Sequence, residues 1–282
     1  MVWKAHHCKA DGISCMGIQL QLDDPYDITK LIKFNPVPLW RRAILTIHSF
    51  FYAPKVFYDA LKPVKKNALH NGDRSDLTGV KDVSVSADMG FERVKAASKK
   101  LKITINELFM TALSVSMKKL FVELGDSKTK KIYIAMPVNI RWKHYERYED
   151  VKLENAFAPT PLKLGLFGNV EEALTQTKRV TRRLKRSFAK TYAVYLGGLM
   201  AQFLLPNWLV KFGIDQASKP LTLGFSNVPG VLRPIKYKGQ ITKSMICSMI
   251  PAGRSGIGIA VLSYADRIQF TVNIDTSIGV KA

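Results

Sequence analysis

The stretch His6-His7-Cys8-Lys9-Ala10-Asp11-Gly12 decides how this chain is interpreted. Residues 2–7 alternate with the period of two expected of a strand, and Ala10-Asp11-Gly12 predicts a turn into a helix that starts near Gly12. A histidine at such a strand end can present a neutral imidazole, the side chain best suited to remove a proton from an alcohol near pH 7. Asp11 is placed to brace the loop, and Gly12 supplies backbone freedom.

The alternative without a function is that two histidines and an Asp-Gly turn occur together by chance. The complete HHxxxDG pattern at a strand-to-helix junction makes this alternative the weaker one. No covalent nucleophile accompanies the motif, because the sequence has no GxSxG and because Cys8 and His7, as strand neighbours, would face opposite sides. A metal site is not expected, since His48, His70 and His144 lack Cys, Asp or Glu partners at ligand spacing.

The charge of the chain is strongly positive. Forty-three Lys and Arg residues stand against 22 Asp and Glu, a formal +21, which favours anionic partners such as nucleic acid, an anionic membrane or the phosphates of CoA. Nucleic-acid binding has only this charge in its favour, because no recognition motif is present. The three cysteines Cys8, Cys15 and Cys247 show no CxxC spacing, which argues against a disulfide framework and favours a reducing compartment.

Beyond residue 80 the pattern of helices and strands becomes regular. We predict helices over 89–100, 107–124 (capped by Thr104 or Asn106) and 170–190, and strands over 83–86, 131–139, 221–227, 241–250, 256–264 and 269–275. Helices and strands that alternate without a βαβ rhythm favour an α/β or α+β fold with a mixed sheet flanked by helices.

Three segments suit a lipid surface. Residues 40–61 are aromatic with basic flanks, although Pro54 is expected to break a continuous helix there. Residues 176–190 are strongly basic and fit CoA phosphates, an anionic membrane or simply a solvated helix face. The apolar run Tyr192–Leu205 is shorter than the roughly 20 residues that a membrane span needs, and no apolar run of signal-peptide length occurs at the start.

The motif and its flanks resemble the wax ester synthase/diacylglycerol acyltransferase family, whose wider group shares the chloramphenicol acetyltransferase fold with condensation domains. Five blocks match in the family's order over nearly the whole chain, which is more specific than HHxxxDG alone. They are the motif with Trp3 to Ser14, the region Val83 to Glu107, Met136-Pro137-Val138-Asn139-Ile140-Arg141 followed by Asn155, Phe225-Ser226-Asn227-Val228-Pro229-Gly230, and Gly258 to Asp275. Glu107 departs from the family, which has Asp after the residue matching Asn106.

The resemblance implies an O-acyltransferase that moves a long-chain acyl group from acyl-CoA to a fatty alcohol or diacylglycerol, with acyl-CoA as co-substrate and no bound cofactor or metal. Within the catalytic motif of His6, His7 and Asp11, the general base would be His7, and Asp11 would be structural, with an expected ion pair to Arg141. Gly12, Asn106, Arg141 and Asn155 are expected motif residues, while Ser226 and Asn227 are candidates to stabilise the oxyanion, a donor worth about 3 kcal/mol. An intracellular, peripheral position at an anionic membrane is expected, at the endoplasmic reticulum or a lipid droplet in a eukaryote.

The position of the motif departs from the family, where a long N-terminal region precedes it. We therefore expect residues 1–80 to be the remnant of an N-terminal subdomain that is largely missing, and residues 81–282 to be the C-terminal acyltransferase subdomain. Pro38-Leu39-Trp40 matches a family motif but lies on the wrong side of the histidines, so we assign it no role. Two alternatives stay open, a non-catalytic, membrane- or lipid-binding remnant of the fold and a relative that acylates an amine or a thiol-tethered substrate.

Overall fold

The computed structural model describes residues 4, 6–7, 9–34, 36–60, 66–70, 77–186, 188–250 and 253–281. In chain order its helices are α1 (Gly12–Leu20), α2 (Leu39–Ala60), α3 (Phe91–Lys100), α4 (Ile105–Glu123), α5 (Val170–Arg186), α6 (Phe188–Leu204) and α7 (Asn207–Ser218). Its strands are β1 (Lys81–Val85), β2 (Met89–Gly90), β3 (Lys131–Asn139), β4 (Phe157–Gly165), β5 (Leu223–Val228), β6 (Lys236–Tyr237), β7 (Gln240–Ile241), β8 (Ile257–Tyr264) and β9 (Arg267–Asp275).

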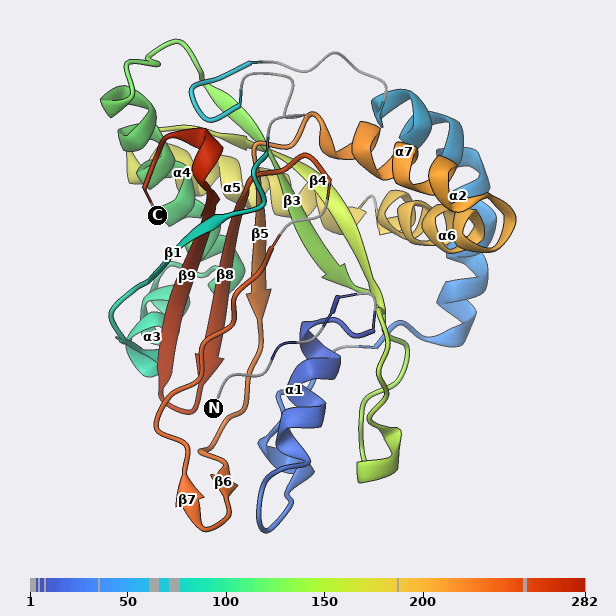
Figure 1. Cartoon of the computed structure of the whole chain (residues 1–282), viewed down its shortest axis with the longest axis vertical. Coiled ribbons are helices and arrows are strands. Elements are labelled where there is room, and N and C mark those ends of the chain that lie inside the picture. The colour runs from blue at the N-terminus through green and yellow to red at the C-terminus, as the bar shows by residue number, and fades with distance from the viewer. Residues whose placement is uncertain are drawn as a thin grey trace.

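One mixed sheet organises the molecule, as the sequence predicts. Its strand order is β1-β9-β8-β5-β3-β4, with β2 also paired to β9, while β6 and β7 form a separate hairpin (Figure 1). The central neighbours β3, β5 and β8 run parallel, and the outer pairs β3–β4, β8–β9 and β1–β9 are antiparallel. The carboxyl ends of the three parallel strands therefore meet at one edge of the sheet.

The main hydrophobic core lies between the sheet and the helices α3, α4 and α5. Phe121 and Met110 of α4 are fully buried there, against Ile134 of β3, Phe225 of β5 and Val261 of β8. Helix α4 starts at a capping box, in which Thr104 accepts from the backbone of Glu107 and the Glu107 carboxylate accepts from Thr104. The capping residue is thus Thr104 and not Asn106.

Helix α1 packs at the edge where the parallel strands end. Met16 and Leu20 of α1 join Val228, at the end of β5, and Leu262 and Tyr264, near the end of β8, in a second apolar cluster. This packing brings the start of α1, and the motif that precedes it, to the carboxyl ends of the strands (Figure 1).

Helices α2, α6 and α7 lie together beyond the β4 edge of the sheet (Figure 1). Leu45 of α2 and Tyr192 of α6 are buried against each other in a third small cluster. No helix within the described part of the chain is long and apolar enough to cross a membrane. Because α2 lies before residue 80 and α6 after it, the two predicted regions share this contact, and the boundary between them stays a prediction.

Most predicted elements are confirmed, but several local predictions are wrong or incomplete. Helix α2 is continuous through Pro54, which only removes one backbone N–H from a helix that packing against α6 supports. The basic helix ends at Arg186, so Lys190 belongs to α6. Strand β4 and helix α7 were not predicted. Of the strand expected over residues 2–7, residues 2, 3 and 5 lie outside the described residues, while Lys4 and His6 are irregular and His7 is in a turn.

The strand expected over 241–250 is present only at its first residue. Met245 and Cys247 pack inward while Ile246 and Ile250 are exposed, so the predicted alternation of burial is real. No backbone group from Lys243 to Ile250 is hydrogen-bonded to another backbone group in the described part of the chain. The segment is extended without a ladder partner, and periodicity alone cannot reveal a missing partner.

Candidate active site

Asp11 caps helix α1 and is 5% exposed. Its Oδ1 accepts the backbone N–H groups of Ile13 and Ser14, both at 3.1 Å, which is the usual role of Asp at the N-cap. Its Oδ2 accepts the backbone N–H of Ala156 at 2.8 Å, and its own N–H donates to the carbonyl of Glu154 at 3.0 Å. Asp11 therefore ties the start of α1 to the residues just before β4.

The expected ion pair between Asp11 and Arg141 is confirmed. Arg141 is 3% exposed, and its Nη2 donates to Asp11 Oδ1 at 2.7 Å and to Ser14 Oγ at 2.8 Å. Burial disfavours the guanidinium charge, but the hydrogen bond and the charge of Asp11 outweigh it and hold the pKa of Arg141 above its ordinary value. Arg141 thus locks Asp11 to the end of β3 through this ion pair.

Tyr145 and Glu154 extend this network towards the surface. The Tyr145 hydroxyl accepts from Arg141 Nε at 3.1 Å and lies 3.3 Å from both Ser14 Oγ and a Glu154 carboxylate oxygen. Arg141 Nε is also 3.3 Å from that carboxylate, whose side chain is partly exposed. Every described donor of this network therefore has an acceptor, as a buried charge requires.

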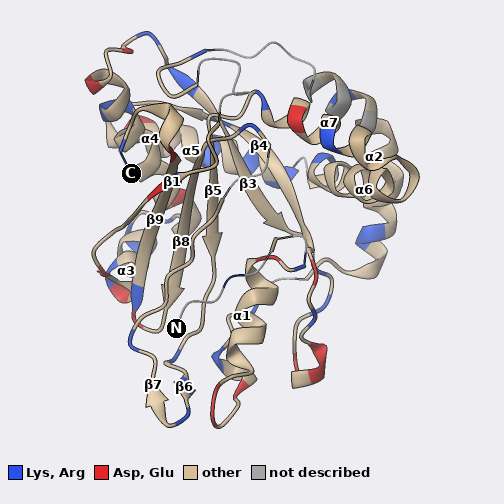
Figure 2. Ribbon diagram, in the orientation of Figure 1, with Lys and Arg blue, Asp and Glu red and all other residues tan. Residues whose placement is uncertain are grey.

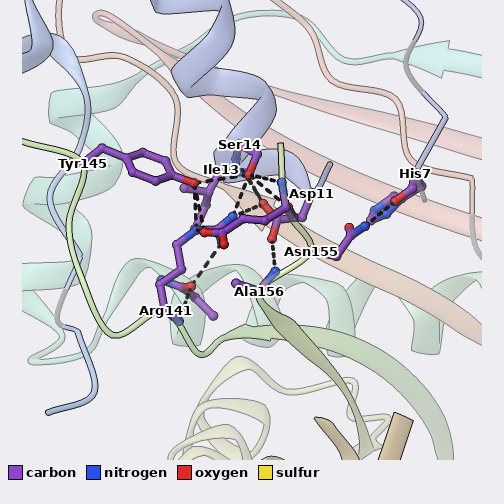
Figure 3. A network of polar contacts seen from close by, with 10 residues as sticks. His7, Asp11, Ile13, Ser14, Arg141, Tyr145, Asn155 and Ala156 are labelled. Atoms are coloured by element: carbon purple, nitrogen blue, oxygen red, sulfur yellow. Dashed lines mark hydrogen bonds and ion pairs between the residues drawn. The ribbon is translucent and has the colours of Figure 1, made fainter. Parts of the chain in front are cut away.

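His7 lies to one side of the network, beyond Asn155 (Figure 3). It is exposed, in a turn, and its carbonyl oxygen accepts the side-chain N–H of Asn155 at 2.8 Å. Its imidazole packs against the Phe157 ring with the centroids 5.5 Å apart and the planes at 63°. His6 is exposed too, and its carbonyl accepts the backbone N–H of Lys9 at 2.9 Å. The backbone and the ring of His7 are thus both in contact with side chains near the start of β4.

Gly12 allows the motif to approach the end of β5. A Cβ at this position would lie 2.9 Å from Val228 Cγ2 and 3.1 Å from Val228 Cγ1. Glycine is thus needed for close packing, in addition to the backbone freedom that the sequence suggests. The contact places the motif directly against the Ser-Asn-Val-Pro-Gly strand end that contains Ser226 and Asn227.

The two oxyanion candidates have different surroundings. Ser226 is 7% exposed within β5, opposite Ala260 of β8 in the parallel register. Asn227 is partly exposed, and its Nδ2 donates to Asn106 Oδ1 at 2.6 Å. Asn106 and Asn227, predicted from separate blocks, are therefore brought together, and the oxyanion role of Ser226 and Asn227 stays a prediction.

The described cysteines do not supply a nucleophile. Burial, with smaller contributions from Asp11 and Cys247, raises the pKa of Cys15 to about 11, and burial also raises the pKa of Cys247. Both thiols stay protonated at neutral pH, and only the thiolate is strongly nucleophilic. Cys8 lies outside the described residues. No group of three or more His, Cys, Asp or Glu side chains suited to a metal ion occurs in the described part of the chain.

Sequence reasoning missed Tyr145 and Phe157 as contacts of the motif. Asn155 was predicted as a motif residue, and the hydrogen bond to His7 shows what it touches. Tyr145 lies four residues after Arg141 and Phe157 two after Asn155, so both adjoin predicted residues, but no spacing rule points to either.

Residues 155–281 match the WS/DGAT C-terminal domain. Over 99% of its length, the chain is 21% identical to a protein of Mycobacterium tuberculosis (strain CDC 1551 / Oshkosh) described as a "probable diacyglycerol O-acyltransferase". The chain spans 64% of that relative. It is thus distantly related to diacylglycerol O-acyltransferases along nearly its whole length.

Solved structures share the fold. The wax ester synthase/diacylglycerol acyltransferase from Marinobacter aquaeolei VT8 superposes with a TM-score of 0.56 at 16% identity, covering 95% of this chain and 59% of that one. The starter condensation domain of rhizomide synthetase gives a TM-score of 0.54 at 10% identity, covering 96% and 59%. The chain therefore has the condensation-domain and chloramphenicol acetyltransferase-like α/β fold, as predicted.

Proposed function

This chain carries the C-terminal domain of the WS/DGAT family, and we propose that it acts in O-acyl transfer from a long-chain acyl-CoA to a fatty alcohol or diacylglycerol, with His7 as the general base. The observation that carries the proposal is the anchoring of the His7 motif. Asp11 and Arg141 fix the helix after the histidine, and Asn155 fixes the backbone of the histidine itself, while the imidazole stays accessible.

The proposed reaction uses one base twice. The imidazole of His7 takes the proton of the acceptor hydroxyl while the oxygen attacks the thioester carbonyl, which forms a C–O bond and a tetrahedral oxyanion. The oxyanion collapses, the C–S bond breaks, and the CoA sulfur takes the proton back from the imidazolium. Donors near the end of β5, with Ser226 and Asn227 as candidates, would stabilise the oxyanion. Asp11 acts through structure, since both of its oxygens are occupied by Arg141 and by backbone N–H groups.

His7→Ala tests the base assignment. The assay incubates the chain with labelled palmitoyl-CoA and hexadecanol, dioleoylglycerol or a long-chain amine, and measures labelled ester or amide. We expect transfer to the alcohols to fall by about 100-fold or more, as loss of a general base does. The matched control is His48→Ala, an exposed histidine on α2. Unchanged turnover in His7→Ala, or amide as the main product, would refute the assignment.

We also infer that the chain binds an anionic lipid surface and that its helices α2, α6 and α7 make the contact. Helix α2 has two stripes. Leu45 and Ser49 are buried on the side that faces α6, whereas an outer stripe at intervals of three and four residues is exposed. The outer stripe consists of Trp40, Ile44, Ile47, Phe51, Pro54 and Tyr58. An amphipathic helix with an aromatic outer face suits a membrane interface.

The bend between α6 and α7 also exposes large apolar side chains. Phe203 is 81% exposed, Leu204 69% and Trp208 70%. The helix α6 is mostly without charge (Figure 2), and the basic residues of this region include Arg41, Lys55 and Lys211. Exposed aromatic side chains beside lysine and arginine match an anionic bilayer, in which the rings enter the interface and the cations meet phosphate.

Co-sedimentation with vesicles tests the lipid surface. We expect binding to phosphatidylserine/phosphatidylcholine vesicles that salt weakens, and we expect Phe203→Ser with Trp208→Ser to reduce the partition coefficient by about tenfold or more. Val122→Ser, at an exposed position of α4, is the control and should bind as the wild type does. Equal binding by all three proteins would contradict the proposed surface. Lipid binding without any acyl transfer would favour the non-catalytic alternative, which the exposed apolar helices support.

A further inference from the structure

We propose that Phe157, with Asn155 beside it, is a positioning residue that sets the orientation of the His7 imidazole. The inference rests on the proposed function, because orientation matters for catalysis only if His7 is the base.

Residues 154–157, at which β4 begins, are joined to the motif at four successive positions. The carbonyl of Glu154 accepts from Asp11 N, the side chain of Asn155 donates to the His7 carbonyl, the N–H of Ala156 donates to Asp11 Oδ2, and the ring of Phe157 packs on the His7 ring. These contacts hold the His7 backbone in register with residues 154–157, and the same register brings Phe157 to the imidazole.

A catalytic histidine usually has its ring oriented by a hydrogen bond to the nitrogen that does not react. For His7, no hydrogen bond to either ring nitrogen occurs within the described ranges of the chain. The tilted contact with Phe157, 5.5 Å between centroids at 63°, is the one ring contact that the described residues provide. Edge-to-face packing of this kind favours one ring orientation by about two- to tenfold.

Phe157 is itself held firmly. Phe157 is the first residue of β4 and lies opposite Asn139 in the antiparallel ladder with β3. Asn139 in turn lies two residues before Arg141 in the chain. The backbone of Phe157 is therefore fixed by the same strand pair that fixes Arg141 and Asp11. A hydrophobic ring also orients the imidazole without occupying its nitrogens, so that both stay available to the acceptor hydroxyl and to a proton.

The test is heteronuclear NMR of the chain labelled with ¹³C-histidine. The His7 ring signals are assigned from His7→Gln and compared in Phe157→Leu, Phe157→Tyr and Phe167→Leu, the last a phenylalanine beyond the other end of β4. We expect the ring-current displacement of the His7 C–H signals to vanish in Phe157→Leu and to persist in the other two. His7 signals that do not move in Phe157→Leu, or that move equally in Phe167→Leu, would overturn the proposal.

A kinetic measurement separates positioning from a structural role. We expect kcat to fall by about two- to tenfold in Phe157→Leu with KM unchanged, and Phe157→Tyr to restore it, because only the ring contact differs. A rise in KM together with a fall in kcat and lost circular dichroism would show a structural role and refute the proposal. The two proposals can fail separately. If Phe157→Leu displaces the His7 signals but His7→Ala keeps full acyl transfer, the ring contact is confirmed and the role of His7 as general base is refuted.

Discussion

Replacing Asp11 by Asn is the most informative test of the network that supports the motif. The substitution preserves size but removes the charge that faces Arg141 at 2.7 Å, where both side chains are almost completely buried. It also replaces an oxygen acceptor by an N–H donor at one of two positions that accept backbone N–H groups. The guanidinium is then left in a buried site with mostly neutral acceptors.

The magnitude follows from what remains around Arg141. Removing one partner of a buried ion pair costs about 3–5 kcal/mol. Glu154, whose carboxylate lies 3.3 Å from Arg141 Nε and is partly exposed, offsets some of the loss. We therefore expect Asp11→Asn to lower the free energy of unfolding by about 3 kcal/mol. Arg141→Met leaves Asp11 with three backbone donors, from Ile13, Ser14 and Ala156, and should cost slightly less.

The assay is urea denaturation followed by tryptophan fluorescence and by circular dichroism, with coincident transitions required. The double variant Asp11→Asn with Arg141→Met completes a double-mutant cycle. We expect its loss in free energy of unfolding to be smaller than the sum of the two single losses by about 1–3 kcal/mol. Asp266→Asn, which removes the exposed ion pair with Arg267, serves as the control and should change stability little.

Two results would refute this reasoning. Additive losses in the double variant would show that Asp11 and Arg141 do not stabilise each other. A stability loss in Asp11→Asn no greater than that in Asp266→Asn would show that the buried pair contributes no more than an exposed one.

Three further predictions concern other parts of the fold. Gly12→Ala should lower stability by about 1–3 kcal/mol, because the new methyl group meets Val228, and Val228→Ala in the same chain should recover part of the loss in thermal unfolding. Phe121→Ala, at a fully buried position of α4, should cost about 3–5 kcal/mol in urea. Asp275 accepts from Lys81, Thr78 and Ser277, which outweigh its burial and hold its pKa well below 3.8, so the wild type should lose stability as the pH falls below 3.8. Asp275→Asn should lack this acid-dependent part, and the stability difference between the two proteins should shrink in urea titrations at successively lower pH.

Each of these predictions has a contrary outcome. A single Gly12→Ala variant as stable as the wild type would show that the motif glycine is not required by packing. Phe121→Ala with wild-type stability would contradict the assignment of the core. An undiminished difference between wild type and Asp275→Asn in acid would mean that the Asp275 carboxylate is not preferentially ionised in the folded state.

The sequence by itself determined the features that depend on near neighbours in the chain. The sequence placed the start of α1 near Gly12 and named Thr104 as one of two cap candidates for α4, and both helix starts depend on side chains two or three residues away. The strands β3, β8 and β9 follow from their apolar runs and alternation, and the block around Arg141 was recognisable as a motif. These signals need no partner from elsewhere in the chain.

Tertiary structure decided what depends on a distant partner. Strand β4 escaped prediction because Pro159 and Pro161 argue against a strand, yet β4 is an edge strand of the sheet, where proline is tolerated. The segment after β7 alternates like a strand but has no ladder partner in the described chain. The contact of His7 with Phe157 arises because the order β8-β5-β3-β4 gathers strand ends far apart in sequence at one edge. A spacing rule reports only local geometry, and the orientation of the proposed base depends on which strand ends the sheet brings together.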